Sequence, residues 1–364
     1  MKLLKLVETH LIYSNINETE APYWSNTETY DKGDEVIVGN QIPHKIYLSL
    51  VDNNTGNYPP DYVWKDLENN YSEWNRTSTY SSGDRVKVSY EEDGITPLDT
   101  PQAFESLTDD NKGNYPPTDT THWKSLDLWK DLGATNKYAM FDDKVMSQTV
   151  NSDVIEVVVE FSNCDAFALF NLYADSIEWE LYDGSYANLD NLVISGEISN
   201  LQEPVSDWYE YFFSDILWKD SVFVSNLPKY RYGQLRIKIN PVADKAKCGL
   251  FVYGKTRNLG DTLFDAKVGI IDFSKKEIDD EGNATLKQGN FVKRAECDIW
   301  TYTKGIDIIR KELASVRATP SVFIFNNQDT TFDSLIIYGF FRDFDILLSN
   351  PIYSKCSITV EGLI

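Results

Sequence analysis

Two stretches of the sequence repeat one another and decide the fold of the first third of the chain. They read YWSNTETYDKGDEVIV, residues 23–38, and EWNRTSTYSSGDRVKV, residues 73–88. Each is followed by a middle segment, IYLSLVDNNTGNYPP (46–60) or AFESLTDDNKGNYPP (103–117), and by a closing VWKDL (63–67) or HWKSL (122–126). Internal repetition of this kind predicts two copies of one structural unit.

Each copy is short enough to form a small antiparallel sheet of three strands. Gly33 and Gly83 suit a turn that needs a positive φ, and an alternating strand follows each of them. The Pro-Pro pairs after the middle strands end the ladder, because proline has no backbone N–H to donate. We expect Trp64 and Trp123 to close the two cores, which gives modules at residues 21–68 and 69–130.

The repeated motif resembles a known family. The order Trp, Tyr-x-x-Gly-Asp-x-Val, an aromatic residue, Gly-x-x-Pro-Pro and Trp is similar to the small chitin-binding type of carbohydrate-binding module, over about residues 22–67 and 72–126. Modules of this type occur in phage tail proteins. The resemblance implies ten aromatic residues as glycan contacts or as the module core: Trp24, Tyr30, Tyr47, Tyr58, Trp64, Trp74, Tyr80, Phe104, Tyr115 and Trp123.

The repeats also depart from the family at one place. Family members that bind chitin carry exposed tryptophans soon after the middle aromatic residue, where this chain has Val51-Asp52 and Thr108-Asp109. A role as spacers or docking modules is therefore an equal alternative to glycan binding.

The middle of the chain predicts a β-sandwich over residues 134–254. Its segments VIEVVVEF, AFALFNLYA, SIEWELYDG, WYEYFFS, SVFVSNL and QLRIKINP combine β-branched and aromatic residues with apolar–polar alternation. Gly, Pro, Asn and Asp clusters separate them, which is typical of short antiparallel strands. We read residues 129–143 as the linker that enters this region.

Residues 255–364 predict an antiparallel β domain with a single helix at about 305–319, which Pro320 ends. The motifs IDFSKKEID, RATPSVFIF, LIIYGFFRDF and ITVEGLI resemble the C-terminal parts of phage tail or baseplate proteins. A sheet that flanks one helix is similar to the tail-tube and distal-tail fold, whose subunits form rings around the tail axis. The fold class is thus mainly β and multidomain, with residues 1–20 as an N-terminal docking segment.

Charge and cysteine content narrow the classes of partner. The chain has 57 acidic and 34 basic residues, a net charge of −23, so neither nucleic acid nor an anionic membrane surface is an expected partner. No apolar run reaches membrane-spanning length, and no secretory signal is evident at the start. Four dispersed cysteines, Cys164, Cys248, Cys297 and Cys356, predict buried thiols rather than a metal site or disulfides.

The sequence contains no motif that predicts catalysis, a cofactor or a metal. None of the three histidines lies in an HExxH run, and the sequence has no GxSxG or phosphate-loop motif. Glu178 and Glu180 share a strand face, which favours a solvated surface over a glycosidase pair. The Asp- and Asn-rich segments 52–57, 108–114 and 279–283 favour turns, with calcium binding as the lesser alternative.

We therefore expect a non-enzymatic virion component of a phage tail or baseplate, made in the host cytoplasm. It would form a homo-oligomer around the tail axis, contact other tail or baseplate proteins, and present its modules for host attachment to a surface glycan or for fibre docking. Two alternatives stay open: a polysaccharide depolymerase or glycoside hydrolase with accessory binding modules, and a bacterial surface lectin.

Overall fold

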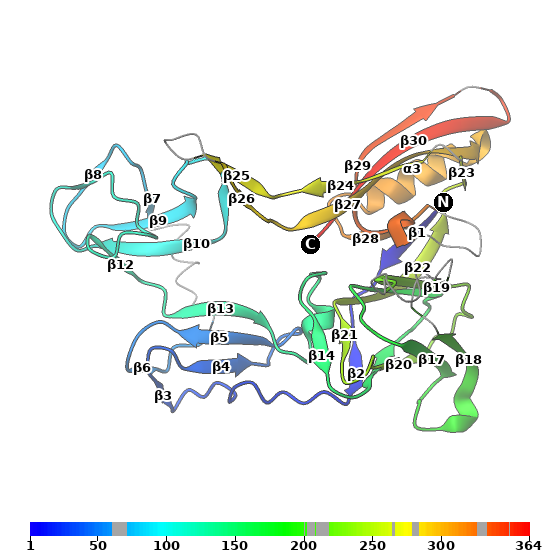
Figure 1. Ribbon diagram of the computed structural model, residues 1–364, viewed down its shortest axis with the longest axis horizontal. Coiled ribbons are helices and arrows are strands. Elements are labelled where there is room, and N and C mark those ends of the chain that lie inside the picture. The colour runs from blue at the N-terminus through cyan, green and yellow to red at the C-terminus, as the bar shows by residue number, and fades with distance from the viewer. Residues whose placement is uncertain are drawn as a thin grey trace. The chain divides into compact units, whose positions relative to one another are not determined.

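The computed structural model describes residues 1–59, 71–199, 201, 208, 218–263, 266–278, 284–325, 333–348 and 350–364. The predicted closing residue Trp64, the turn at 279–283 and most of the strand predicted at 208–214 lie outside these ranges. The chain is mainly β, as predicted, and a curled antiparallel sheet is its largest element (Figure 1). It divides into two compact units, Glu18–Thr135 and the combination of Met1–Asn17 with Asn136–Ile364.

The larger unit contains a ten-stranded sheet in which all neighbours are antiparallel. Its order is β19 (Ser221–Ser225), β16 (Ala166–Phe170), β22 (Leu250–Asn258), β1 (Lys2–Leu6), β28 (Ser321–Ile324), β29 (Ile336–Leu347), β30 (Tyr353–Gly362), β27 (Phe291–Tyr302) and β23 (Asp261–Thr262). Strand β24 (Lys267–Asp272) also pairs with β27.

A second sheet of five strands belongs to the same unit. Its order is β18 (Leu192–Ser199), β17 (Ser176–Asp183), β20 (Gly233–Asn240), β15 (Ile155–Glu160) and β2 (Leu11–Ser14). Buried side chains of the two sheets meet, as where the ring of Phe167 on β16 meets Trp179 on β17 edge to face, with centroids 6.2 Å apart. Short elements complete the unit: β14 (Thr149–Asn151) with β21 (Ala246–Cys248), β25 (Lys275–Ile278) with β26 (Ala284–Lys287), and the 3-10 turns η1 (Ala139–Phe141), η2 (Leu189–Asn191), η3 (Thr303–Gly305) and η4 (Asp333–Leu335).

Two predicted boundaries in this unit need correction. The segment 1–20 is not a separate docking segment, because β1 lies between β22 and β28, and Met1, Leu3 and Leu4 are fully buried. The predicted boundary at 254 falls inside β22, which pairs with both β16 and β1. The central and C-terminal regions therefore share one sheet.

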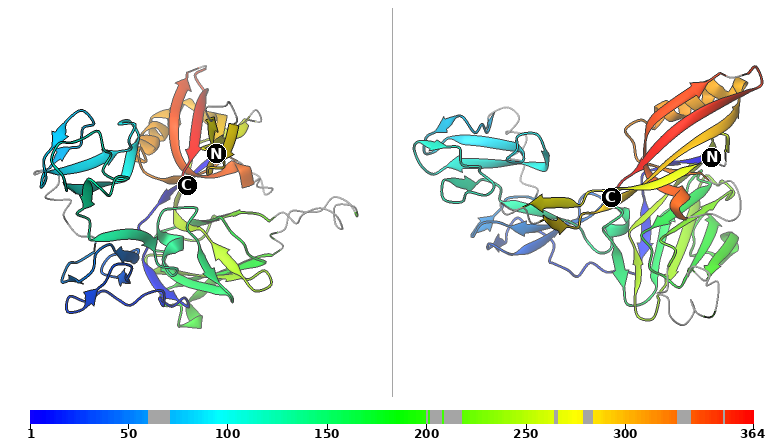
Figure 2. Two further views of the ribbon diagram at one scale, coloured as in Figure 1. Left: turned by 60° about the vertical axis from the view of Figure 1, so that its left-hand side comes forward. Right: turned by 45° about the horizontal axis from the view of Figure 1, so that its top comes forward.

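Helix α3 (Ile306–Ser315) is shorter than the predicted 305–319. Its buried face follows helical spacing, with Ile309 and Leu313 packed against Cys297, Ile299 and Ile358 of the large sheet, whereas Ile308 is exposed. Figure 2 shows α3 lying along one side of β27, β29 and β30. The helix therefore covers one face of that part of the sheet.

The smaller unit holds the two repeats. Module 1 consists of β3 (Thr29–Tyr30), β4 (Glu35–Val38), β5 (Lys45–Ser49), β6 (Asn54–Thr55) and β13 (Trp129–Ala134). Module 2 consists of β7 (Ser72–Glu73), β8 (Thr79–Tyr80), β9 (Arg85–Tyr90), β10 (Pro97–Ser106), β11 (Asn111–Lys112) and β12 (Trp123–Ser125). Gly33 and Gly83 have φ values of +100° and +90°, so each turn needs a residue without a side chain.

The third strand of module 1 differs from the prediction. The residues read as a linker from Trp129 onwards form β13, which pairs with β5 in the order β13–β5–β4. Module 2 lies in the sequence between β6 and β13. It is therefore an insertion into module 1.

Candidate functional site

The predicted aromatic residues form two matching module cores. Tyr30 and Tyr47 are buried with Trp129 in module 1, and Trp24 and Tyr58 pack against them. The corresponding core in module 2 contains Tyr80, Phe104, Tyr115 and Trp123, with Trp74 packed against it. Of the ten predicted residues, nine thus lie in these clusters, and Trp64 is outside the described residues.

The rings in both cores pack edge to face. Tyr30 meets Trp129 with centroids 5.5 Å apart, and Tyr80 meets Trp123 at 5.2 Å. Such pairs each contribute about 0.5–1.5 kcal/mol beyond the area that they bury. Because all four of these rings are buried, they are not available as a platform for sugars.

The Asn-rich turns of the modules are held by side-chain amides. Asn54 donates from Nδ2 to Ser49 Oγ at 3.2 Å, and Asn111 donates to Ser106 Oγ at 3.0 Å. Asp52 and Asp109, which stand near the family's exposed tryptophan positions, each accept a backbone N–H at 3.0 Å. Each carboxylate thus connects its own turn to the turn at Gly33 or Gly83. Among the described residues, no group of three or more His, Cys, Asp or Glu side chains could hold a metal ion.

Glu178 and Glu180, the two carboxylates considered for acid–base chemistry, both accept hydrogen bonds from neighbouring side chains. Glu180 accepts hydrogen bonds from Tyr182 at 2.7 Å and from Arg236 at 3.2 Å, and Glu178 accepts one from Asn240 at 3.0 Å. This face of β17 is therefore a cross-strand polar network. This network is closer to the expected solvated strand face than to a glycosidase pair of free carboxylates.

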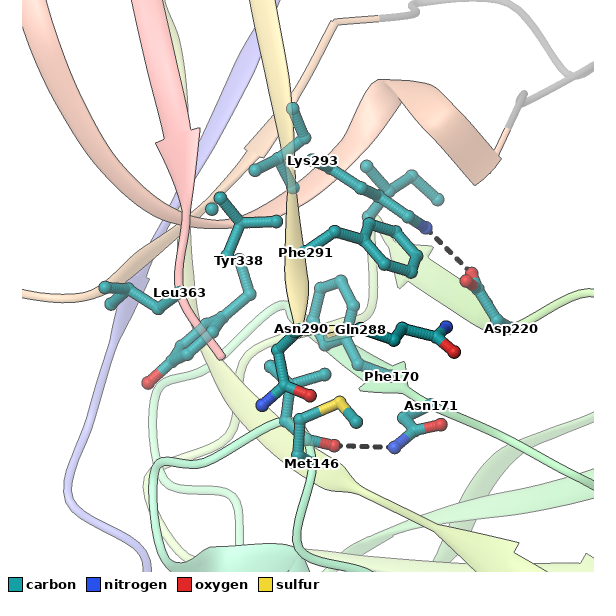
Figure 3. A pocket seen from close by; sticks show the side chains of 16 residues that line it. Met146, Phe170, Asn171, Asp220, Gln288, Asn290, Phe291, Lys293, Tyr338 and Leu363 are labelled. Carbon is teal, nitrogen blue, oxygen red and sulfur yellow. Dashed lines mark hydrogen bonds and ion pairs between the residues drawn. The ribbon is translucent and has the colours of Figure 1, made fainter. Parts of the chain in front are cut away.

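A cavity of about 330 Å³ lies in the larger unit, beside the start of β27 (Figure 3). Phe170, Phe291, Tyr338 and Leu363 provide much of its apolar lining. Lys293 and Asp220 form an ion pair at 2.8 Å, which is visible as a dashed line. The size suits a small apolar group or a side chain.

Two further polar side chains of the cavity, Asn171 and Tyr338, donate hydrogen bonds to backbone carbonyl groups. Asn171, in the left-handed conformation with a φ of 52°, donates from Nδ2 to the carbonyl oxygen of Val145 at 2.8 Å. Tyr338 donates to the carbonyl oxygen of Asp143 at 3.2 Å, and burial raises the pKa of its phenol, as do the nearby Asp143 and Asp142 carboxylates. A phenol that stays protonated and bonded in this way is a structural donor rather than a base.

The strands β24 and β27 continue beyond the helix as a two-stranded arm that leads to the β25–β26 hairpin (Figure 1). Ile270 pairs with Lys293, and Val268 pairs with the buried Ala295. Residues paired across strands share a face, so Val268 and Ile270 continue the core face of the sheet. Val268 is 46% exposed, Ile270 65% and Phe291 58%.

We call Val268, Ile270 and Phe291 the apolar strip of the arm. The sequence prediction missed it, although the alternation in KVGIID carried the signal. In the described sheet β24 pairs with β27 alone, so its other edge presents free backbone groups.

Comparison with known proteins does not assign the chain to a family. No protein-family model, curated protein or solved structure matches the chain. No helix in the described parts of the chain is long and apolar enough to cross a membrane.

Proposed function

We propose that this chain is a structural component of a phage tail or baseplate, which assembles into a homo-oligomer around the tail axis through its C-terminal β region. The observation that carries the proposal is the arm, in which an apolar strip and an open strand edge stand together. Isolated exposed apolar residues are ordinary on protein surfaces, but a strip beside a free edge is a template for another chain.

A second copy is the partner that this arrangement favours. Contact between the arm of one copy and a different surface of the next would be head-to-tail, and such contacts close into rings when the rotation allows it. The antiparallel sheet with one covering helix supports the likeness to tail-tube and distal-tail subunits, and the two sheets of the larger unit support a sandwich-like central region.

In the same proposal the two modules serve attachment of the virion or docking of a fibre. Their aromatic rings belong to the cores, which supports a role as compact spacers or protein-docking modules over glycan binding by those ten residues. Neighbouring tail or baseplate proteins are the further partners.

The test measures the mass of the full-length protein in solution over a range of concentrations. Ile270→Lys places a charge in the apolar strip, and we expect it to weaken self-association at least tenfold. Leu189→Lys changes a comparably exposed leucine, 73% exposed on η2, and serves as the matched control. A wild-type protein that stays monomeric at high micromolar concentration, or equal association of both variants, contradicts the proposal.

A further inference from the structure

Three aromatic side chains lie together on the face of the large sheet opposite to α3. Trp300 and Tyr302 are two residues apart on β27, and Tyr353 on β30 is the cross-strand partner of Tyr302. The ring of Tyr353 is 4.9 Å from that of Tyr302 and 5.9 Å from that of Trp300, between centroids. We call these three residues the aromatic ledge.

The alternation of β27 places the ledge away from the core. Cys297, Ile299 and Thr301 are buried and face the helix side, whereas Trp300 is 42% exposed and Tyr302 64%. The apolar strip of the arm shares the face of the buried residues, so the ledge and the strip lie on opposite faces of the sheet. The proposed assembly surface therefore does not account for the ledge.

The backbone under the ledge is fixed by side-chain hydrogen bonds. Asn350 accepts from the backbone N–H of Tyr353 at 2.8 Å and from that of Ile352 at 2.7 Å. Thr303, next to Tyr302, bonds through its hydroxyl to Ser354 Oγ at 2.9 Å and donates from its backbone N–H to the Ile352 carbonyl at 2.9 Å. The backbone that carries the rings is thus fixed before any ligand arrives, which lowers the entropic cost of binding.

Polar groups flank the ledge along the same face. Lys355 is the cross-strand partner of Trp300 and forms an ion pair with Asp298 at 2.7 Å. On the neighbouring strand β29, Asp345 is the cross-strand partner of Ser357, and Leu347 is the cross-strand partner of Lys355. The surface therefore combines exposed ring area with hydroxyl, ammonium and carboxylate groups at its side.

The ligand class follows from this chemistry. Aromatic rings offer apolar contact to the C–H faces of a sugar, and the flanking groups offer hydrogen bonds to its hydroxyls. The carboxylates of Asp298 and Asp345, together with the net charge of −23, disfavour nucleic acids and other polyanions, which need a basic surface. Hydrogen bonding between the two phenols raises the pKa of Tyr353, so the ring stays neutral at physiological pH.

We propose that Trp300, Tyr302 and Tyr353 form a binding site for a neutral saccharide chain. The site is distinct from the ten aromatic residues of the repeats and does not depend on the proposed assembly. In an oligomer the same site would recur in every copy, and avidity would add roughly 10²–10⁴-fold to a weak single contact.

The test uses the full-length protein with saturation-transfer NMR and three oligosaccharide probes. Cellohexaose and hexa-N-acetylchitohexaose are neutral, and hexagalacturonate is the anionic comparison. We expect saturation transfer to at least one neutral probe and none to the anionic probe. Trp300→Ala and Tyr302→Ala should weaken binding at least tenfold, which is about 1.4 kcal/mol.

Two further variants make the result specific. Tyr302→Phe keeps the ring and should retain most of the binding, and Tyr232→Ala removes an aromatic residue that is 66% exposed elsewhere in the unit and should leave binding unchanged. The proposal is overturned by equal binding of wild type and both alanine variants, by no binding of either neutral probe at millimolar concentration, or by equal binding of hexagalacturonate. Loss of self-association in Trp300→Ala would instead assign the ledge to an interface between copies and overturn it too. Because saturation transfer measures ligand binding and not self-association, a failure to bind the probes leaves the assembly proposal to its own test.

Discussion

The indole Nε1 of Trp129 donates a hydrogen bond to the carbonyl oxygen of Asn57 at 3.1 Å, and this bond joins residues 72 positions apart in the sequence. In module 2 the equivalent bond runs from Trp123 to Asn114 at 3.0 Å, over nine positions. The two modules thus have the same closing contact. In module 1, however, the closing tryptophan comes after the whole of module 2.

This contact predicts which tryptophan stabilises module 1. Trp129→Ala removes a buried ring and its hydrogen bond, so we expect a loss of about 3–5 kcal/mol in the local stability of module 1. Hydrogen exchange of the full-length protein should then quicken in β4 and β5 and stay unchanged in β9 and β10. Trp123→Ala should show the reverse pattern.

A matched control for this prediction lies in the sequence itself. Trp-Lys-Asp-Leu occurs at 64–67 and again at 129–132, so Trp64→Ala changes the same residue in the same local context. We expect it to leave β4 and β5 protected. Faster exchange of those strands in Trp64→Ala, with normal protection in Trp129→Ala, would show that the wrong segment has been assigned to the third strand.

A second prediction concerns Asp143, whose φ of 63° is in the left-handed region. Burial raises the pKa of its carboxyl, and the neighbouring Asp142 raises it further. A carboxyl whose pKa is higher in the folded than in the unfolded state binds more protons when folded. Its contribution to stability therefore falls as the pH rises through the interval between the two pKa values.

Asp143→Asn removes the carboxyl and therefore the loss of stability as the pH rises. Asparagine also tolerates the left-handed conformation. We expect the variant to unfold at a higher temperature than the wild type at neutral pH and at the same temperature near pH 3. The side chain keeps contact with solvent, so the gain should be a few tenths of a kcal/mol. Thermal unfolding against pH measures it, with Asp244→Asn as the control for the loss of one negative charge. An equal gain in the control at neutral pH would refute the local explanation.

The cysteines give a third prediction. All four are free and buried, as the sequence indicated. Burial raises the pKa of Cys164 to about 11 and that of Cys297 to about 12, and it also raises the pKa of Cys248 and Cys356. Since the thiolate is the reactive form, iodoacetamide should modify none of them quickly at pH 8 in the folded protein. Mass spectrometry should find four modified residues after denaturation. Rapid modification of any cysteine in the native state would contradict its burial.

Local patterns in the sequence predicted those parts of the fold that depend on near neighbours. Gly33 and Gly83 identified their turns because a positive φ is a property of one residue. The apolar residues of α3 recur at helical spacing, which indicates the buried face through Ile309 and Leu313, but the exposed Ile308 belongs to the same apolar pattern. Whether an apolar helical residue is covered depends on the width of the surface opposite, which the sequence does not report.

Contacts between distant segments were not predictable in this way. The nearer of the two Trp-Lys-Asp-Leu segments was assigned to module 1, because nothing local distinguishes Trp64 from Trp129. The aromatic ledge does leave a signal in the sequence, because Trp300 and Tyr302 alternate in step with the charged residues Arg294, Glu296 and Asp298. Aromatic residues in register with charged ones belong to the solvent face of a strand.

The position of β1 in the large sheet determines when that sheet can be completed during synthesis. Lys2–Leu4 pair with Val322–Ile324, so this strand gains its second neighbour only after more than three hundred further residues have been made. The two modules between them pair only with strands of their own segment of the chain and can fold meanwhile. A chain that terminates before β28 would lack the three strands that join β1 to β27 and would leave one edge of β1 unpaired, and such a product should be a substrate for chaperones and proteases.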